Sequence, residues 1–367
     1  MAVAQGVTAY HAPGRVNLIG EHTDYNGGFV LPAAISLGCT IRVSSAPAGK
    51  LVLRSKQMLD TAEVEIASLL DAKPRKHWSD YVIGVARELA SLGLVIEPAT
   101  LEIDATVPTG SGLSSSAALE VATAYALLSG RPLEKLEIAK LCQRAERNFV
   151  GMPCGIMDQY TSVFGVAQHA ILLDCRELTH QLVPIPEGVE LVAVNTMVKH
   201  ELGSSAYRQR VAECAEALSH FPGKATLRDV TLAELERTAA SMPEIPLARA
   251  RHIILECWRV LQFHEAATAG DLERMGRLFV ESHRSLQHDY AVSCEELDYL
   301  VDTALTIPGV YGARMTGGGF GGCTVNLVKS SELENFETAI AARYKERFNI
   351  DATIIRCHPS AGAGPVG

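Results

Sequence analysis

VPTGSGLSSSAALE, residues 107–120, joins an expected strand to an expected helix through a loop of glycines and serines. Residues 100–107 alternate apolar and polar side chains, which is typical of a half-buried strand, and the Ala- and Leu-rich continuation indicates a helix. Glycines at 110 and 112 let the backbone turn sharply and bring its N–H groups close to an anion. The first amides of the following helix would point to the same place. The stretch therefore predicts a phosphate-binding loop.

Three serines in this loop add hydroxyl groups that can donate to phosphate or bind Mg²⁺, namely Ser114, Ser115 and Ser116. The glycines are not followed by GK[ST], and their spacing is not GxGxxG, so the loop is neither a Walker A loop nor a dinucleotide-binding fingerprint. A serine-rich helix cap behind a glycine turn is an equally good interpretation of the loop taken alone.

Strands and helices alternate on both sides of the loop. Branched apolar residues predict strands at 29–43, 51–54, 170–174, 191–195, 323–328 and 352–357. Helical spacing predicts helices at 78–92, 133–149 and 333–348, with a helix-rich region at about 205–287. For a chain of 367 residues, this alternation predicts a two-domain α/β or α+β protein with its site in the cleft between the domains.

The composition is that of an ordinary globular protein, with 47% apolar and 20% charged residues. The formal net charge of -9 argues against nucleic acid as a partner, because nucleic-acid-binding surfaces are basic.

The first residues, MAVAQGVTAYHAPGR, lack the pattern of a secretory signal, and no apolar run approaches the roughly 20 residues that span a bilayer. Nine cysteines without a CxxC pair favour reduced thiols. We therefore expect a cytoplasmic protein without a membrane partner.

The segment GRVNLIGEHTDYNGG, residues 14–28, gathers hydrogen-bonding side chains behind two apolar residues. Donors and acceptors this close together suit a ligand with neighbouring hydroxyl groups, because each hydroxyl both donates and accepts. They are Glu21, His22, Asp24, Tyr25 and Asn26. A polar turn closed by Gly27 and Gly28 is the alternative, although a turn does not need so many ionisable groups.

Phosphoryl transfer needs positive charge at the phosphate and a carboxylate near the attacking hydroxyl. Asp158, in the loop GMPCGIMDQY (residues 151–160), has apolar neighbours that make an unpaired charge costly. Arg15 is the partner that we expect, since its guanidinium could also offset charge on the transferred group. Glu146, on the preceding helix, is a candidate Mg²⁺ ligand. Considered individually, Asp158 could equally be an ordinary loop aspartate, and Glu146 could be a solvent-exposed residue of the helix.

Other chemistries find little support in the sequence. His22 lacks the partner of an HExxH motif, and His283 and His288 are not at zinc-binding spacing. None of the serines lies in a GxSxG turn.

Four segments resemble the GHMP kinase superfamily, in this order along the chain: residues 14–28, 107–120 and 151–159, and MTGGGFGGC at 315–323. The first and third of them resemble the galactokinase family in particular. The resemblance covers nearly the whole chain. It implies an N-terminal α/β domain like ribosomal protein S5 domain 2, residues 1–190, and a C-terminal ferredoxin-like domain, residues 191–367, with ATP between them.

The resemblance also implies a reaction, in which ATP phosphorylates the C1 hydroxyl of α-D-galactose to galactose 1-phosphate. Asp158 matches the catalytic base of the family, and Arg15 matches the arginine that orients this base and stabilises the transition state. The remaining sugar-binding positions match Glu21, His22, Asp24, the backbone at Gly155, and Tyr207 in the looser match KHELGSSAYRQR (residues 199–210).

ATP and its metal ion are implied to bind at a second set of matching positions. The phosphate cradle is matched by Gly110, Ser111, Gly112, Leu113, Ser114 and Ser115. Ser116 and Glu146 match the Mg²⁺ ligands. Trp78 and Tyr81, in KHWSDY, resemble the aromatic residues of the adenine pocket, although their helical spacing alone makes them core residues. The turn at 316–322 is expected to close over the substrate side of the cleft, or to be no more than a tight strand connection.

Two further hypotheses stay open. The same chemistry could serve another acceptor, such as N-acetylgalactosamine or arabinose, because a few residues outside the motifs can change sugar selectivity. A catalytically silent sensor of galactose and ATP is the second, but such relatives lose residues of the serine-rich loop, and GLSSSAA is complete here. We expect a monomer that binds galactose and ATP.

Overall fold

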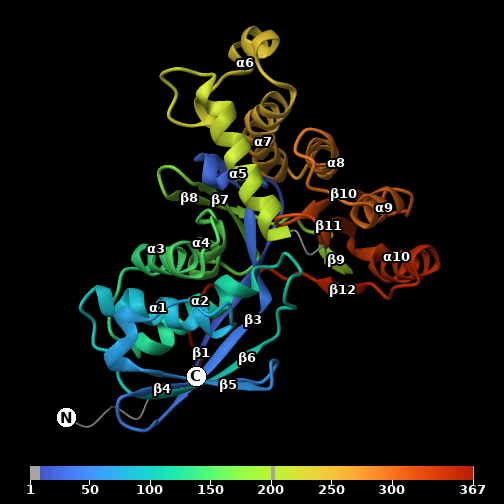
Figure 1. The fold of residues 1–367 in the computed structure, drawn as a ribbon. Helices are drawn as coiled ribbons and strands as arrows, with labels where there is room; N and C mark the ends of the chain where they lie inside the picture. The colour runs from blue at the N-terminus through green and yellow to red at the C-terminus, as the bar shows by residue number, and fades with distance from the viewer. Residues whose placement is uncertain (1–8, 200–202, 367) are drawn as a thin grey trace.

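The computed structural model describes residues 9–199 and 203–366, and Figure 1 shows their arrangement. Residues 1–8 of the N-terminal segment MAVAQGVTAYHAPGR and residues 200–202 of the Tyr207 segment lie outside the described residues. Within the described part, no helix combines the length and the apolar character that crossing a membrane requires.

The first sheet has the strand order β13-β1-β3-β6-β4-β5 in the described chain. Its strands are β1 (Ala9–Asn17), β3 (Pro32–Ser44), β4 (Lys50–Ser55), β5 (Asp60–Glu65), β6 (Ala99–Ala105) and β13 (Gly364–Val366). Only the β4–β6 pair is parallel among these strands. Helices cover one face of the sheet (Figure 1): α1 (Ser79–Ser91), α2 (Ser115–Leu128), α3 (Lys135–Arg144) and α4 (Met157–Phe164).

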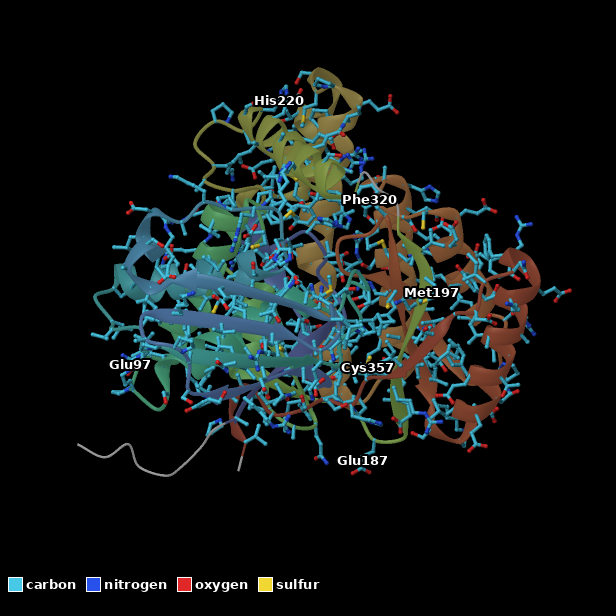
Figure 2. All side chains as sticks on the ribbon, turned by 60° about the horizontal axis from the view of Figure 1, so that its bottom comes forward. Glu97, Glu187, Met197, His220, Phe320 and Cys357 are labelled. Atoms are coloured by element: carbon cyan, nitrogen blue, oxygen red, sulfur yellow. The ribbon has the colours of Figure 1, made fainter. Side chains whose placement is uncertain are left out.

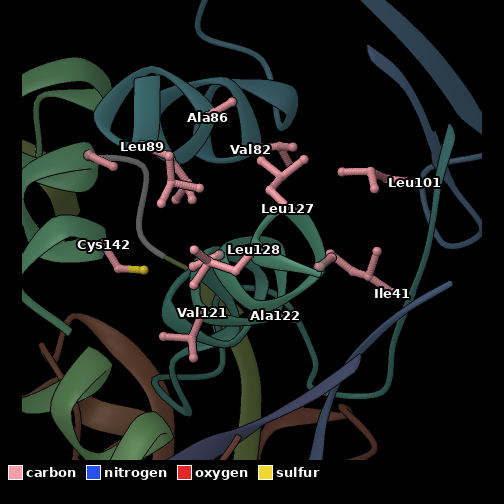
Figure 3. Close-up of a cluster of buried hydrophobic side chains, with 14 of the residues drawn as sticks. Ile41, Val82, Ala86, Leu89, Leu101, Val121, Ala122, Leu127, Leu128 and Cys142 are labelled. Carbon is pink, nitrogen blue, oxygen red and sulfur yellow. The ribbon is translucent and has the colours of Figure 1, made fainter. Parts of the chain in front are cut away.

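The core of this layer lies between the sheet and the helices (Figure 3). Val82 and Leu89 of α1 meet Val121 of α2 and Leu101 of β6, all of them buried. The expected helix at 78–92 is confirmed as α1, and its apolar face points into this core. Tyr81 is only half-buried, on the side that lines the pocket described below.

The second sheet has the order β10-β11-β9-β12 and is antiparallel throughout. Its strands are β9 (Val189–Lys199), β10 (Val310–Thr316), β11 (Gly321–Lys329) and β12 (Thr353–Arg356), with α9 (Glu295–Ala304) before β10 and α10 (Leu333–Phe348) before β12. This order of strands and helices is ferredoxin-like. Together with the first layer, this order agrees with the expected two-domain α/β (α+β) architecture.

Strand alternation explains how the second sheet packs on both faces. Val192 and Val194 of β9 face α9 and α10 in one cluster of buried side chains. Leu191 and Ala193, one residue out of phase, belong to another cluster that joins the sheet to α7, α8 and the end of β1. Side chains of successive strand residues point to opposite faces, so β9 can serve both cores at once.

The remaining elements surround these two layers. A third sheet has the order β2-β7-β8, formed by β2 (Phe29–Val30), β7 (His169–Asp174) and β8 (Thr179–Pro184). The helix-rich region is confirmed as α5 (Gly203–Ser219), α6 (Leu232–Thr238), α7 (Glu244–Ala269) and α8 (Leu272–His288). Short helical turns are η1 (Asp24–Asn26), η2 (Ile66–Asp71), η3 (Ala145–Val150), η4 (Leu227–Asp229), η5 (Ala239–Ser241) and η6 (Ser330–Glu332).

The structure corrects several of the expected elements of secondary structure. The helix expected at 133–149 is wrong as a single α-helix, because α3 ends at Arg144 and the chain continues as the π-helical turn η3. The sequence pattern also missed β1, whose register shifts between Pro13 and Arg15 and so breaks the alternation. β5, β8, β10, β13 and the helix α9 were missed as well. The loop expected at 151–160 is wrong at its end, because α4 begins at Met157 and Asp158 lies in its first turn.

The C-terminal strand returns to the N-terminal layer. β13 pairs with β1, and one buried cluster contains Val16 of β1 together with Phe263 of α7 and Val325 of β11. β9, the first strand of the second sheet along the chain, begins at Val189, close to residue 190. The division into residues 1–190 and 191–367 stays a prediction.

Candidate active site

A pocket of about 910 Å³ collects side chains from segments far apart in the sequence. Its lining comes from the end of β6, the loop before α2, the loop before α4, and the turn between β10 and β11. Phe320, labelled in Figure 2, belongs to that last turn. The expected site residues that line the pocket are Arg15, Glu21, His22, Asp24, Trp78, Tyr81, Gly110, Gly112, Ser114, Ser115, Ser116, Glu146, Gly155, Asp158 and Tyr207.

Arg15 and Asp158, 143 residues apart in the chain, form the expected ion pair. Arg15 Nε donates to Asp158 Oδ1 at 2.9 Å, and Nη2 lies 2.7 Å from the same oxygen. Arg15 Nη1 donates to the carbonyl of Gly112, which ties the guanidinium to the phosphate loop. Because Arg15 is buried in β1, the carboxylate of Asp158 is held in one place beside this loop.

Ser114 holds the other oxygen of Asp158. Its Oγ donates to Asp158 Oδ2 at 2.5 Å. Ser114 is the residue before α2 and has a left-handed backbone (φ +60°), but its side chain does not cap the helix. The helix-cap interpretation is therefore wrong for this serine. The first turn of α2, with Ser115 and Ser116, lines the pocket.

Two members of the expected phosphate cradle differ from the others. Ser111 and Leu113 are buried and are not among the described side chains that line the pocket. Ser111 Oγ donates to the carbonyl of Pro108 at 2.7 Å, and Leu113 belongs to a hydrophobic cluster. Their contribution to an anion site would come from the backbone.

Asp24 and Gly155 touch at one end of the pocket. A Cβ at Gly155 would lie 1.8 Å from Asp24 Oδ2, so only glycine fits beside this carboxylate. Burial raises the pKa of Asp24 from 3.8 to about 6, and the negative charge of Asp158 adds to this effect, whereas the N–H of Tyr25 lowers it. A ligand hydroxyl that donates to Asp24 would meet a poorly solvated acceptor.

Glu21 joins the first motif to the late glycine-rich turn. Its carboxylate pairs with the fully buried Arg314 of β10 and accepts from the N–H of Gly317 at 3.0 Å. Thr316 Oγ1 lies 3.2 Å from the same oxygen, Oε1. Glu21 thus lines the pocket and also fixes the turn between β10 and β11 in place.

His22 lies within a group of aromatic rings, those of Tyr25, Tyr207 and Tyr290, at centroid distances of 4.8 to 5.9 Å. Its Nδ1 is 3.0 Å from the hydroxyl of Tyr25. Burial, with the nearby His252 and Arg210, lowers the pKa of His22 to about 3, so the imidazole is neutral at pH 7. Tyr207, from the first turns of α5, brings the second half of the chain to this end of the pocket.

Glu146 and Ser116 come together at the other side of Asp158. Glu146 sits in the π-helical turn η3, a wide turn of the kind often found at functional sites. Desolvation raises its pKa to about 7, with a further contribution from Asp158, while hydrogen bonds from Ser116, Cys154 and Gln159 lower it. Among the described residues, no group of three or more His, Cys, Asp or Glu side chains forms a metal cluster.

Trp78 and Tyr81 lie at the end of the pocket next to the first sheet. Trp78 Nε1 donates to Asp60 Oδ2 at 2.9 Å, which fixes the indole. Sequence reasoning missed the residues around them: Ser55, Gln57, Met58, Ile103 and Ala105. Ile103 and Ala105 could have been found, since they end the strand that leads into the phosphate loop. Met58 follows β4 in a turn that no motif marks.

Comparison with known proteins agrees with this geometry. Three family models match the chain: "GHMP kinases N terminal domain" at residues 80–166, "Galactokinase galactose-binding signature" at residues 3–45, and "GHMP kinases C terminal" at residues 263–346. A galactokinase of Roseiflexus sp. is 44% identical over 97% of this chain and 92% of its own length, and one of Chloroflexus aggregans is 45% identical over 96% and 91%. The chain belongs to the galactokinase family. It is therefore a kinase, a phosphotransferase that uses ATP and an alcohol group as acceptor.

Two solved structures share this fold. A Lactococcus lactis galactokinase crystallised with galactose superimposes with a TM-score of 0.94, at 35% identity, over 99% of this chain and 96% of that one. A mevalonate kinase of Methanococcus jannaschii has a TM-score of 0.69 at 19% identity and shares the fold alone.

Proposed function

We propose that this galactokinase family member transfers the γ-phosphoryl group of ATP to the C1 hydroxyl of α-D-galactose, giving galactose 1-phosphate and ADP. The observation that carries the proposal is the Arg15–Asp158 pair, set between the phosphate loop and the Asp24–Gly155 end of one pocket. The galactose-binding signature at residues 3–45, and the relative crystallised with galactose, support this sugar as the acceptor.

Asp158 is proposed as the catalytic base. Arg15 and Ser114 hold one oxygen each, and a carboxylate has lone pairs left for a further hydrogen bond. The proton of the C1 hydroxyl passes to Asp158 while the C1 oxygen forms its bond to the γ-phosphorus, and the bond from that phosphorus to the ADP oxygen breaks. Arg15, next to both Asp158 and Gly112, stabilises the charge that develops on the transferred group.

The sugar is proposed to bind through Asp24, Glu21, His22, Tyr207 and the backbone of Gly155, in addition to Arg15 and Asp158. Carboxylates accept from sugar hydroxyls, and the neutral imidazole of His22 offers one donor or one acceptor. Because these polar groups are buried, a sugar that lacks one hydroxyl group should bind much more weakly. The buried acceptor would then lose its water without gaining a hydrogen-bond partner.

The nucleotide is proposed to lie along the phosphate loop, with its base near Trp78 and Tyr81 and its phosphates over residues 110–116. The residues present fit a Mg²⁺ ion: Ser116 and Glu146 offer hard oxygen ligands, and the raised pKa of Glu146 marks a buried carboxylate that a cation would stabilise. When bound, Mg²⁺ would neutralise charge on the β- and γ-phosphates.

The proposal includes a cytoplasmic monomer without nucleic acid or membrane as partner. All nine cysteines are free thiols, as expected for a reducing compartment, and the net charge of -9 disfavours polyanions.

ADP release measured with a panel of sugars tests the proposal. Galactose should give the highest kcat/KM among galactose, N-acetylgalactosamine, arabinose and glucose. A higher kcat/KM for one of the others would reassign the acceptor. Tight binding of galactose and ATP without any ADP would instead identify a silent sensor.

A further inference from the structure

Gln159 directly follows Asp158 in α4, but its side chain is fully buried. Its Nε2 donates to Glu120 Oε2 at 2.9 Å and to Glu146 Oε2 at 2.6 Å. An amide nitrogen carries two hydrogens, so Gln159 uses one for each carboxyl group. The side chain therefore bridges α2 and the π-helical turn η3 behind the pocket.

This bridge constrains the direction in which Glu146 presents its oxygens. Glu146 lines the pocket, and its Oε2 is held by Gln159. The carbonyl of Glu146, in the π-helical turn η3, accepts from the N–H groups of Gly151 and Met152, which holds the backbone at this residue. With Oε2 held by Gln159 from behind, the carboxyl group of Glu146 stays beside Ser116 and Cys154, which also hydrogen-bond to it.

Glu120 anchors the other end of the bridge. It is fully buried in α2, and no salt bridge joins it to any of the described basic residues. A buried carboxyl group without a neighbouring cation is costly unless it is hydrogen-bonded. Its one hydrogen-bond partner in the described structure is Gln159.

We propose that Gln159 is a positioning residue for the Mg²⁺–ATP site. Gln159 orients the carboxylate of Glu146 and is itself held in place by Glu120. The inference rests on the proposed role of Glu146 as a metal ligand. Hydrogen-bond partners behind a metal ligand commonly change metal affinity by about 10- to 100-fold when they are removed. Because Asp158 and Gln159 are consecutive in α4, one helical turn would place both the base and the metal ligand.

Gln159→Met tests the bridge, since methionine has a similar length and no N–H group. The Mg²⁺ concentration at half-maximal rate should rise about tenfold or more. Binding of Mn²⁺ to the enzyme–ADP complex, followed by electron paramagnetic resonance, should weaken by a similar factor, whereas the Kd for galactose should stay close to that of the wild type. An unchanged metal dependence, or a loss of kcat at unchanged metal affinity, would overturn the proposal.

A second pair of variants keeps the test valid if Gln159→Met does not fold. Glu120→Gln retains an acceptor oxygen for Gln159 and should keep the metal affinity of the wild type, while Glu120→Leu should lose it as Gln159→Met does. Equal metal affinity in these two variants would contradict the anchoring role. The Mn²⁺ measurement needs no sugar, so a failure to phosphorylate galactose would overturn the proposed function without deciding this one.

Discussion

Gly112 of the phosphate loop and Gly317 of the β10–β11 turn pack backbone against backbone. A Cβ at Gly317 would lie 2.9 Å from the Cα of Gly112, and a Cβ at Gly112 would lie 2.9 Å from the carbonyl oxygen of Thr316. Both residues have positive φ, +79° and +86°. The late glycine-rich turn therefore supports the phosphate loop, and side chains at this joint would force the two segments apart.

Gly317→Ala should lower both stability and ATP binding. An alanine held in the left-handed backbone conformation costs about 1–3 kcal/mol of stability, and the close contact with Gly112 adds to this cost. Thermal unfolding and the KM for ATP are the measurements. Gly318→Ala is the matched control for stability, because its Cβ would come no closer than 3.5 Å to the ring of Tyr207. Equal melting temperatures for the two variants would show that the joint is not tight.

Asp158→Asn should lower kcat by about 10²- to 10⁴-fold, the usual contribution of a general base. The amide keeps the shape of the carboxylate, so the Kd for galactose, measured by calorimetry, should change little. A variant with near-normal kcat would exclude Asp158 as the base. The function of Arg15 would then have to be explained without its contact to a catalytic base.

Gly155→Ala should raise the KM for galactose, because a methyl group 1.8 Å from Asp24 Oδ2 must displace that carboxylate. Steady-state kinetics with galactose as the varied substrate measure the effect. A double-mutant cycle supplies the control: in an Asp24→Ala background, the additional effect of Gly155→Ala should largely disappear. Additive effects would mean that Gly155 acts independently of Asp24.

Asp24 should make the ligand-free protein less stable as the pH rises from about 4 to about 6. The folded protein holds the proton of Asp24 up to pH 6, and the unfolded chain releases it near 3.8, so the unfolded state binds fewer protons in this window. Each unit of pKa difference is worth about 1.4 kcal/mol. Urea unfolding between pH 4 and pH 7 should show a shallower decline for Asp24→Asn than for the wild type. Parallel curves for the two proteins would contradict the raised pKa.

Much of the local structure could be predicted from the sequence because it depends on neighbouring residues. The periodic apolar residues of α1 and α10 gave their positions to within one residue. Glycines followed by serines and a helix marked the phosphate loop. Where the pattern failed, a local irregularity was the reason: Pro13 and Gly14 interrupt β1 with a register shift, and the turn after Arg144 widens without any marker in the sequence.

The sequence by itself determined the family, the loop that can cradle phosphate, and the residue types needed for phosphoryl transfer. Only the tertiary structure decided which of them meet. It paired Arg15 with Asp158 across 143 residues, turned Ser114 away from capping α2 and toward Asp158, and set Glu21 between Arg314 and Gly317. Hydrogen bonds and burial of this kind depend on distance in space, and a sequence pattern reports only distance along the chain.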